Sequence, residues 1–182
     1  MSTGYHLVRW ITGDDVRQGG SGSSGARNVG RALGRWGFVA TMAGDIAKGA
    51  AAPAAVRLAG GTPACVGIAG VAVVAGHVWP VYLGFHGGRG LTTAFGAGLA
   101  LEPRVAGAAL GIAAGLAPVV HGLTAAGIAG TFSAPLVAIA MRRDPPRIAA
   151  MAGIAAIVGV GHRSHIRRFA AARTTWPKGD AP

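Results

Sequence analysis

Residues 105–141 read VAGAALGIAAGLAPVVHGLTAAGIAGTFSAPLVAIAM, a run that contains no Asp, Glu, Lys or Arg. A membrane-spanning α-helix needs about 20 consecutive, mostly apolar residues at a rise of about 1.5 Å per residue. The run is long enough for two such helices, which we expect at about 105–120 and 122–141. Its many Gly and Ala residues are typical of closely packed membrane helices, because small side chains let helix backbones approach one another.

The flanking sequence continues this pattern. Between Leu58 and Glu102 the only Asp, Glu, Lys or Arg is Arg89. The stretch 91–101 is apolar but too short to cross alone, so we expect a half-helix or re-entrant segment there. Further spans are expected at about 36–57, 62–83 and 147–161, separated by the helix breakers Gly60-Gly61-Thr62-Pro63, Glu102-Pro103-Arg104 and Arg142-Arg143-Asp144-Pro145-Pro146-Arg147. The sequence therefore predicts an all-α polytopic integral membrane protein of about five to six membrane helices with glycine-rich cytoplasmic loops.

Composition excludes several other classes. Of the 182 residues, 51% are hydrophobic and only 13% are charged, which excludes a disordered chain. A single cysteine excludes a disulfide scaffold. The net charge of +11 is unevenly spread: segments 1–35, 36–161 and 162–182 carry +3, +4 and +4, so the two ends are dense in charge and the middle is sparse. Basic ends around apolar spans indicate cytoplasmic loops of a membrane protein rather than a nucleic-acid-binding protein.

The first polar interruption is the glycine-rich segment 20–31. Gly20, Gly22 and Gly25 imitate a dinucleotide-binding fingerprint, but no strand is predicted before them, so that interpretation fails. A glycine-rich loop that enters a helix N-terminus exposes backbone N–H groups, and Arg27, Asn28, Arg31 and the hydroxyls add side-chain donors. The segment is either an anion-binding loop or a flexible basic loop.

The second interruption is Asp45 with Lys48 inside an apolar span. Their i,i+3 spacing puts both on one helix face, where they either form a buried ion pair that fixes packing or line a polar cavity.

Two more interruptions follow. His77 precedes the turn Gly87-Gly88-Arg89-Gly90, which is either a second anion-binding loop or a membrane-edge turn with an anchoring arginine. The last is the segment 162–168, in which His162, His165 and Arg168 share one helix face. This segment either contributes to anion binding or carries basic residues that snorkel at a helix end. Two histidines are too few for a zinc site, and we expect neither a metal nor a cofactor.

These residues, in this order, resemble the acyl-phosphate:glycerol-3-phosphate acyltransferases, the PlsY family, over residues 2–173. The first motif is similar to Gly20–Arg31, a membrane Asp-x-x-Lys-Gly to Asp45–Gly49, the second motif to Gly76–Thr93, and the third to His162–Arg168. The resemblance implies transfer of a fatty acyl group from acyl phosphate to the 1-hydroxyl of glycerol 3-phosphate, giving lysophosphatidate for phospholipid synthesis. It also implies a multi-pass protein of the inner (plasma) membrane whose active-site loops face the cytoplasm.

The resemblance implies roles for sixteen residues. Catalytic roles fall to Ser21, Arg31, His162 and His165. Substrate-binding roles fall to Gly22, Gly25, Asn28, Asp45, Lys48, His77, Gly87, Gly88, Arg89, Gly90, Thr93 and Arg168. The expected partners are acyl phosphate, glycerol 3-phosphate and membrane lipid, with no nucleic acid, and the sequence leaves the oligomeric state open.

The chain departs from the family's pattern in several places. Arg27 stands where the family has Thr, Arg89 where it has Lys, and His165 where it has Asn. The family's first spanning helix is missing, so we expect either a start further upstream or a shortened, divergent member. A catalytically impaired homologue that binds lipid precursors is the alternative function.

Residues 1–173 are expected to form one membrane domain and 174–182 a frayed tail. If all motif loops are cytoplasmic, the number of membrane crossings between the second and third motifs must be even, so 91–101 must count as one crossing. The Arg142–Arg147 loop then lies on the outer side of the membrane, against the positive-inside trend.

Overall fold

The computed structural model describes residues 2–120 and 122–166, and in this part of the chain every regular element is helical. The α-helices are α1 (Thr3–Thr12), α2 (Ala26–Leu58), α3 (Pro63–Val78), α4 (Leu91–Leu101), α5 (Pro103–Leu116), α6 (Leu123–Ala140) and α7 (Pro145–Gly161). Two 3₁₀ turns, η1 (Val16–Gln18) and η2 (Val81–Leu83), lie in the connections. The all-α prediction is confirmed, while the expected tail 174–182 falls outside the described residues.

The expected spans match α2, α3, α5, α6 and α7, and the short 91–101 stretch is α4. The breakers act as predicted. Thr62 caps α3 by accepting a hydrogen bond from the Cys65 N–H, and Asp144 caps α7 by accepting one from the Arg147 N–H. A proline follows each cap, where its missing N–H costs the helix nothing.

The N-terminal third differs from the prediction. Helix α1 was not predicted, and α2 begins at Ala26, ten residues before the expected 36. The early part of α2 has arginines at 27, 31 and 35 between its apolar residues and is interrupted at Gly34, whose φ of 72° only glycine adopts readily. A search for apolar runs therefore missed a helix that continues beyond the apolar part of the molecule.

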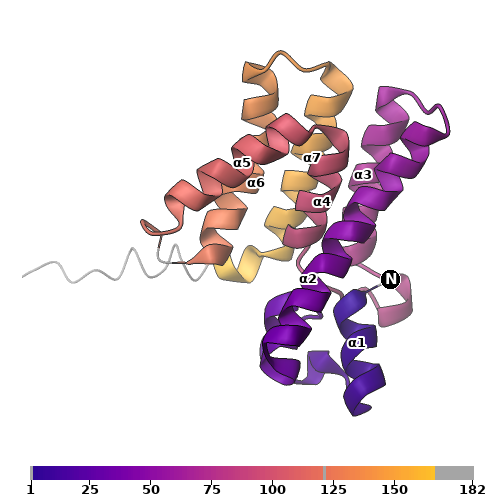
Figure 1. Cartoon of the computed structure of the whole chain (residues 1–182), viewed down its shortest axis with the longest axis vertical. Helices are drawn as coiled ribbons and strands as arrows, with labels where there is room; N and C mark the ends of the chain where they lie inside the picture. The colour runs from indigo at the N-terminus through magenta and orange to yellow at the C-terminus, as the bar shows by residue number, and fades with distance from the viewer. Residues whose placement is uncertain (1, 121, 167–182) are drawn as a thin grey trace, which may run out of the picture.

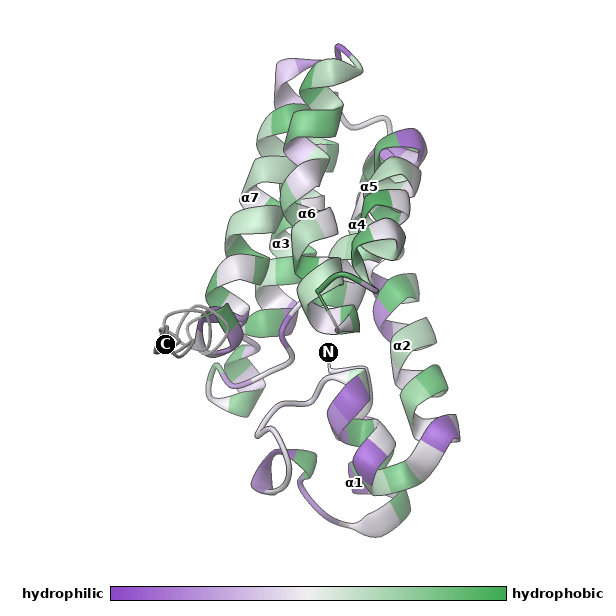
Figure 2. Ribbon diagram, turned by 90° about the vertical axis from the view of Figure 1, so that its left-hand side faces the viewer, coloured by the Kyte–Doolittle hydropathy of each residue, from purple (hydrophilic) through white to green (hydrophobic). Residues whose placement is uncertain are grey.

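The helices α2–α7 form a bundle with α1 at one end (Figure 1). The connections 13–25 and 79–90, and residues 117–120 after α5, lie at the same end as α1, and the α2–α3, α4–α5 and α6–α7 turns lie at the other (Figures 1 and 2). By length and composition Pro63–Leu83 and Leu123–Ala140 could cross a membrane, and α4, α5 and α7 are shorter apolar helices.

Small residues bring the helices together. A Cβ added at Gly96 of α4 would overlap the Ile46 carbonyl of α2, and one added at Gly130 of α6 would lie 2.6 Å from the Ala109 carbonyl of α5. This close backbone approach is the packing that the Gly/Ala content predicted. The buried core includes Val74, Leu101, Val105 and Val158.

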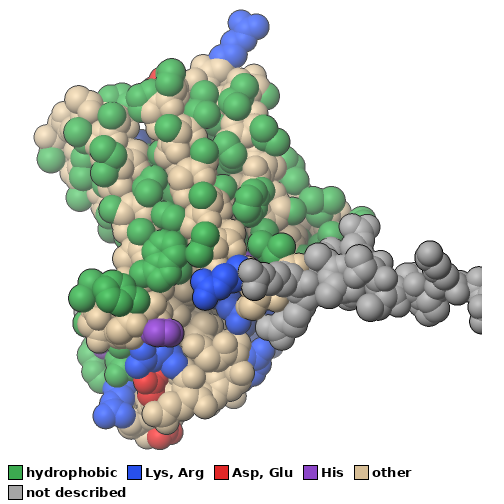
Figure 3. Space-filling view, turned by 180° about the vertical axis from the view of Figure 1, so that it is seen from behind, with side chains coloured by type: hydrophobic (Ala, Val, Ile, Leu, Met, Phe, Trp, Pro, Cys, Tyr) green, Lys and Arg blue, Asp and Glu red, His purple; other side chains and the backbone are tan. Residues whose placement is uncertain are grey.

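Large apolar side chains cover the outside of the bundle, among them Leu136, Ile68 and Leu110 at 67%, 68% and 53% exposure. On the face shown in Figure 3 they spread over the bundle, whereas charged and histidine side chains gather mostly at the α1 end. This distribution is that of a helix bundle surrounded by lipid.

An ion-pair cluster closes the opposite end. The Glu102 carboxylate, at the α4–α5 corner, lies 3.1 Å from Nε of both Arg143 and Arg147. Arg147 also pairs with Asp144 at 2.7 Å. The Arg142–Arg147 loop thus lies at the end opposite the motif loops, and two of its arginines are paired within the protein.

Candidate functional site

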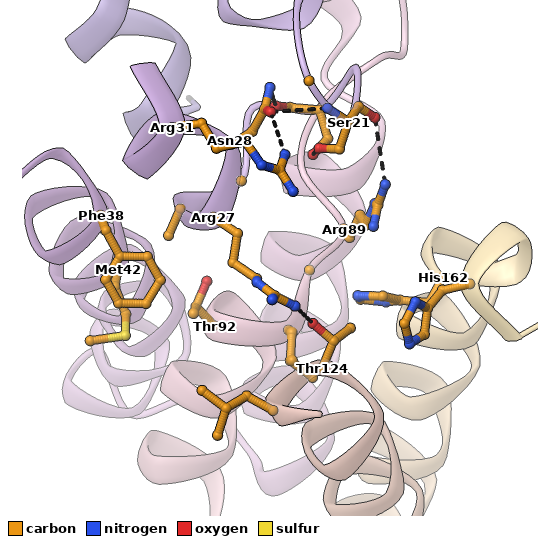
Figure 4. A pocket seen from close by; sticks show the side chains of 18 of the residues that line it. Ser21, Arg27, Asn28, Arg31, Phe38, Met42, Arg89, Thr92, Thr124 and His162 are labelled. Carbon is orange, nitrogen blue, oxygen red and sulfur yellow. Dashed lines mark hydrogen bonds between the residues drawn. The ribbon is translucent and has the colours of Figure 1, made fainter. Parts of the chain in front are cut away.

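A cavity of about 940 Å³ opens at the α1 end of the bundle (Figure 4). Its lining comes from the loop before α2, from α2, α3, α4 and α6, from the loop between α3 and α4, and from the segment after α7: Gly20, Ser21, Ser23, Gly25, Ala26, Arg27, Asn28, Arg31, Phe38, Met42, His77, Arg89, Gly90, Leu91, Thr92, Leu123, Thr124, His162 and His165. Three arginines and three histidines line it, and none of the described lining residues is Asp or Glu. The cavity is therefore suited to anions.

Three helix N-termini point into this cavity. Helices α2, α4 and α6 begin there behind the glycines Gly25, Gly90 and Gly122, and no side chain caps the first turn of any of them. The first N–H groups of a helix lack intrahelical partners and carry the positive end of its dipole. Their convergence adds backbone donors to the arginine side chains, which is a suitable arrangement for phosphate oxygens.

Asn28 organises the loop before α2. Its buried side-chain NH₂ lies within hydrogen-bond distance of the carbonyls of Val16, Gly19 and Ser23, at 2.7, 3.0 and 3.0 Å. Its Oδ1 accepts from the Ser21 N–H at 3.0 Å. The amide is occupied by its own loop, so its geometry supports a positioning role, whereas the resemblance implies that it binds substrate.

The same oxygen of Asn28 holds Arg31. Arg31 Nη1 donates to Oδ1 at 2.9 Å, which fixes the guanidinium at the cavity wall. Gly20 packs against this pair with a φ of 60°, and a Cβ there would overlap Oδ1. Glycine is required here for both its conformation and its size.

The loop between α3 and α4 is fastened to the first loop. The Ser24 N–H donates to the Gly87 carbonyl at 3.4 Å, and Arg89 Nη2 lies 3.5 Å from the Ser21 carbonyl. Arg17 donates to the carbonyls of Leu83 and His86 at 2.8 and 3.3 Å. The two predicted anion-binding loops thus form one unit with Arg89 facing the cavity.

Asp45, Lys48 and His77 support that unit from the bundle side. Lys48 Nζ lies 2.5 Å from Asp45 Oδ1 and 2.7 Å from His77 Nδ1, so the predicted ion pair is confirmed and includes a histidine. Because an ammonium group only donates, His77 Nδ1 accepts and the ring's proton is on Nε2. A Cβ at Gly88 would overlap that Nε2, which shows how closely the loop backbone packs on the ring.

His162 follows the last residue of α7 and is 3% exposed. Its Nδ1 lies 2.9 Å from the Val158 carbonyl, which can only accept, so Nδ1 carries the proton and Nε2 has the free electron pair. Burial lowers the pKa of His162, and the nearby Arg89 and His165 lower it further. The neutral ring, held by its own helix, is suited to accept a proton inside the cavity.

The structure brings nine of the sixteen predicted residues to the cavity wall: Ser21, Gly25, Asn28, Arg31, His77, Arg89, Gly90, His162 and His165. Asp45, Lys48, Gly87 and Gly88 lie behind the wall, as the contacts above describe. Gly22 is in the loop but not at the wall, and Thr93 is fully buried against Gly49 of α2. Arg168 lies outside the described residues. Among those described, no three potential metal ligands cluster.

Ten other lining residues were given no catalytic or substrate-binding role at the sequence level: Gly20, Ser23, Ala26, Arg27, Phe38, Met42, Leu91, Thr92, Leu123 and Thr124. Arg27 was predicted as a side-chain donor of the glycine-rich segment and noted as a departure from the family's pattern, but it was given no catalytic or substrate-binding role. Thr124 stands in an apolar run, where only the fold brings it to the cavity.

A second, apolar hollow of about 360 Å³ runs between α2, α4, α5, α6 and α7. It shares Met42, Leu91 and Thr92 with the first cavity, so the two meet at these residues. Its lining includes Phe95, Ala109, Gly130 and Ile154. One continuous site therefore passes from a cationic cavity to an apolar groove, which fits a ligand with a charged head and an apolar tail.

Comparisons with known proteins agree with this geometry. The family model described as glycerol-3-phosphate acyltransferase matches residues 1–172. Glycerol-3-phosphate acyltransferase 1 of Desulfitobacterium hafniense is 39% identical over 169 residues, which cover 93% of this chain and 84% of that protein. The glycerol-3-phosphate acyltransferase of Geobacter sulfurreducens is 37% identical, with 93% and 87% covered.

Two solved structures are also similar. Both are crystal structures of PlsY, an integral membrane glycerol 3-phosphate acyltransferase. The glycerol 3-phosphate form matches with a TM-score of 0.84 and 31% identity, covering 94% of this chain and 86% of that one. The lysophosphatidic acid form matches with a TM-score of 0.81 and 30% identity, with 95% and 86% covered.

Proposed function

The chain belongs to the PlsY family of integral membrane glycerol-3-phosphate acyltransferases, and from that membership we propose that it uses acyl phosphate as donor and acylates the 1-hydroxyl of glycerol 3-phosphate. As a glycerol-3-phosphate acyltransferase of this type it produces lysophosphatidic acid in phospholipid synthesis. The observation that carries the donor assignment is the cavity lined by Arg27, Arg31 and Arg89, with no Asp or Glu among its described lining residues, which continues into an apolar groove.

The donor's two parts match the two hollows. Its phosphate binds at the loop before α2, where Ser21, the N–H groups near Gly22 and Gly25, and Arg31 supply donors. Its acyl chain lies in the apolar groove. Arg31 is already oriented by Asn28, so little ordering is required when the phosphate binds.

The acceptor binds on the other side of the cavity. Arg89 and the Gly87–Gly90 loop hold the phosphate of glycerol 3-phosphate, and Lys48, Asp45 and His77 fix that loop from behind. The proposed arrangement places both phosphates among arginines and helix N-termini, with the acceptor hydroxyl between the donor and His162.

Transfer then needs no covalent enzyme intermediate, because a mixed carboxylic–phosphoric anhydride is already activated. The hydroxyl oxygen attacks the acyl carbon and its proton passes to Nε2 of His162. The carbonyl electron pair moves to oxygen and returns as the bond to the phosphate oxygen breaks. The products are the ester and inorganic phosphate. The protein contributes proximity, orientation and electrostatic stabilisation.

We also propose that the cavity end of the bundle faces the cytoplasm. The cavity end carries five arginines from the first part of the chain: Arg9, Arg17, Arg27, Arg31 and Arg35. At the opposite end, Arg143 and Arg147 are paired with Glu102. An excess of basic residues in cytoplasmic loops is the general trend for membrane proteins.

The test is acyl transfer by the purified full chain in detergent or nanodiscs. Palmitoyl phosphate with radiolabelled glycerol 3-phosphate is expected to give lysophosphatidic acid, whereas palmitoyl-coenzyme A is not. Arg31→Gln should reduce turnover by about 100-fold, and Arg104→Gln, an exposed site outside the cavity, should not. Turnover with the thioester instead would overturn the donor assignment, and no turnover with either donor would favour an impaired homologue.

A further inference from the structure

Arg27 crosses the cavity that the proposed function uses. From the first turn of α2 its side chain extends to α6, where Nη1 donates to Oγ1 of the buried Thr124 at 2.5 Å. Figure 4 shows the side chain running through the middle of the cavity, with its tip at Thr124 and with Thr92 beside it. The bond joins the first turns of two helices that are 97 residues apart in sequence.

The tip of Arg27 lies where the cationic cavity becomes the apolar groove. Thr124 lines the cavity, and Gly127, three residues further along α6, lines the groove. Thr92, beside the guanidinium in Figure 4, lines both. Arg31, which bonds to Asn28, and Arg89, which lies near the Ser21 carbonyl, line the cavity but are not among the lining residues of the groove.

A ligand whose charged head lies in the cavity and whose apolar tail lies in the groove must place the linking group between them. In an acyl phosphate that group is the carbonyl, and in the product it is the ester carbonyl. We propose that Arg27 is a further catalytic residue of this chain, which donates a hydrogen bond to the acyl carbonyl oxygen and stabilises its negative charge during transfer. This inference rests on the proposed function.

The guanidinium group is suited to this role. It has five N–H donors in a plane, and the bond to Thr124 uses one of them, so others remain for the carbonyl oxygen. As the acceptor hydroxyl adds to the acyl carbon, the carbonyl electron pair moves onto that oxygen and is stabilised by Arg27. When the pair returns, the bond to phosphate breaks, and the hydroxyl proton is on His162. Thr124 acts as a positioning residue that keeps the guanidinium at the junction.

The test compares two unreactive ligands that differ only at the linking carbon. Palmitoylphosphonate carries a carbonyl there, and the alkyl phosphonate of equal length carries a CH₂. In the full chain, Arg27→Ala should weaken binding of the carbonyl ligand by roughly 10-fold or more and leave the CH₂ ligand unchanged. Arg35→Ala, which removes an exposed arginine of α2 outside the cavity, should change neither affinity.

Kinetics supply the second readout. Arg27→Ala should lower kcat by about 100-fold with a smaller change in KM, as expected for the loss of one oxyanion donor. Thr124→Val should lower kcat less, and in the Arg27→Ala background it should have no further effect. Equal weakening of both phosphonates would make Arg27 a phosphate ligand and overturn the inference, as would an unchanged kcat. If wild-type protein binds neither phosphonate, the donor assignment itself fails.

Discussion

At the scale of single residues, the site's charged and polar groups are held in place by the protein's own hydrogen bonds. Arg31 is fixed by Asn28, Lys48 by Asp45 and His77, and the His162 ring by the Val158 carbonyl. Groups oriented in advance lose little entropy when substrate binds and need no reorganisation during reaction. The side chains that hold these groups should therefore affect the rate as strongly as the groups themselves.

Asn28→Asp tests this for the first loop. The change is nearly isosteric, but it replaces the NH₂ that faces three carbonyl oxygens with an acceptor. The loop should lose its shape, and kcat/KM should fall by about 100-fold, the loss that a small misplacement of catalytic groups causes. The assay measures the rate of acyl transfer and, separately, the rate at which a protease cleaves the loop. Gln18→Glu, an exposed site in the same loop with the same charge change, is the control and should behave as wild type. Equal activity of the two variants would contradict the role of Asn28.

His162 gives a prediction about pH. Burial lowers its pKa below the ordinary value of 6.5, so the ring is mostly neutral at pH 7 and its titration lies at lower pH than that of an ordinary histidine. The proton-accepting form should be lost only at lower pH. Histidine-labelled NMR of the solubilised protein, with the signal assigned by its absence in His162→Gln, should give a midpoint below 6.5. The same variant should lose 10²- to 10⁴-fold in kcat. A midpoint at or above 6.5 is the result that this account does not allow.

At the scale of elements, the site is made where helices begin and end. Apolar runs and breakers predicted α3 to α7 well, because lipid-facing helices must be apolar and their ends need caps or prolines. Helix α1 and the start of α2 were missed because they continue beyond the apolar region. The third helix N-terminus at the cavity, that of α6, was also missed, since Thr124 stands in an apolar run and meets Arg27 of α2 only in the folded protein.

Gly88 tests how the second loop is supported. A Cβ there would overlap His77 Nε2, so Gly88→Ala must displace either the loop or the ring that Lys48 holds. We expect KM for glycerol 3-phosphate to rise about 10-fold or more and the thermal midpoint to fall, at a cost of about 1–3 kcal/mol typical of overpacking. The matched control is Gly76→Ala in α3, where a Cβ would meet nothing within 4 Å. Indistinguishable KM values for the two variants would show that the loop does not depend on this contact.

At the scale of the whole molecule, the bundle has two different ends. One gathers the three motif segments, three helix N-termini and the cavity, and the other is closed by the Glu102 ion pairs (Figure 1). The resemblance to the family, carried by the order and spacing of the motifs, was enough to predict which loops lie on the same side. It could not predict that the cavity continues into an apolar groove, because that depends on how α4, α5 and α6 pack.

Labelling of the single cysteine tests the orientation of the protein in the membrane. Cys65 is exposed at the start of α3, at the end opposite the cavity. If the cavity faces the cytoplasm, a membrane-impermeant maleimide should label Cys65 in intact cells. The control is Cys65→Ala combined with Gln18→Cys in the first loop, which should be labelled only after permeabilisation. The reverse pattern would place the cavity on the outer side.

The central claim is that the cavity holds donor and acceptor together and that the acyl group passes directly between them. Rapid-quench single turnover tests it, with enzyme in excess over palmitoyl phosphate. Without glycerol 3-phosphate we expect no phosphate release, and on its addition phosphate and lysophosphatidic acid should appear together in equal amounts. A stoichiometric release of phosphate before the acceptor is added, with the acyl group retained on a residue such as Ser21, would contradict the account.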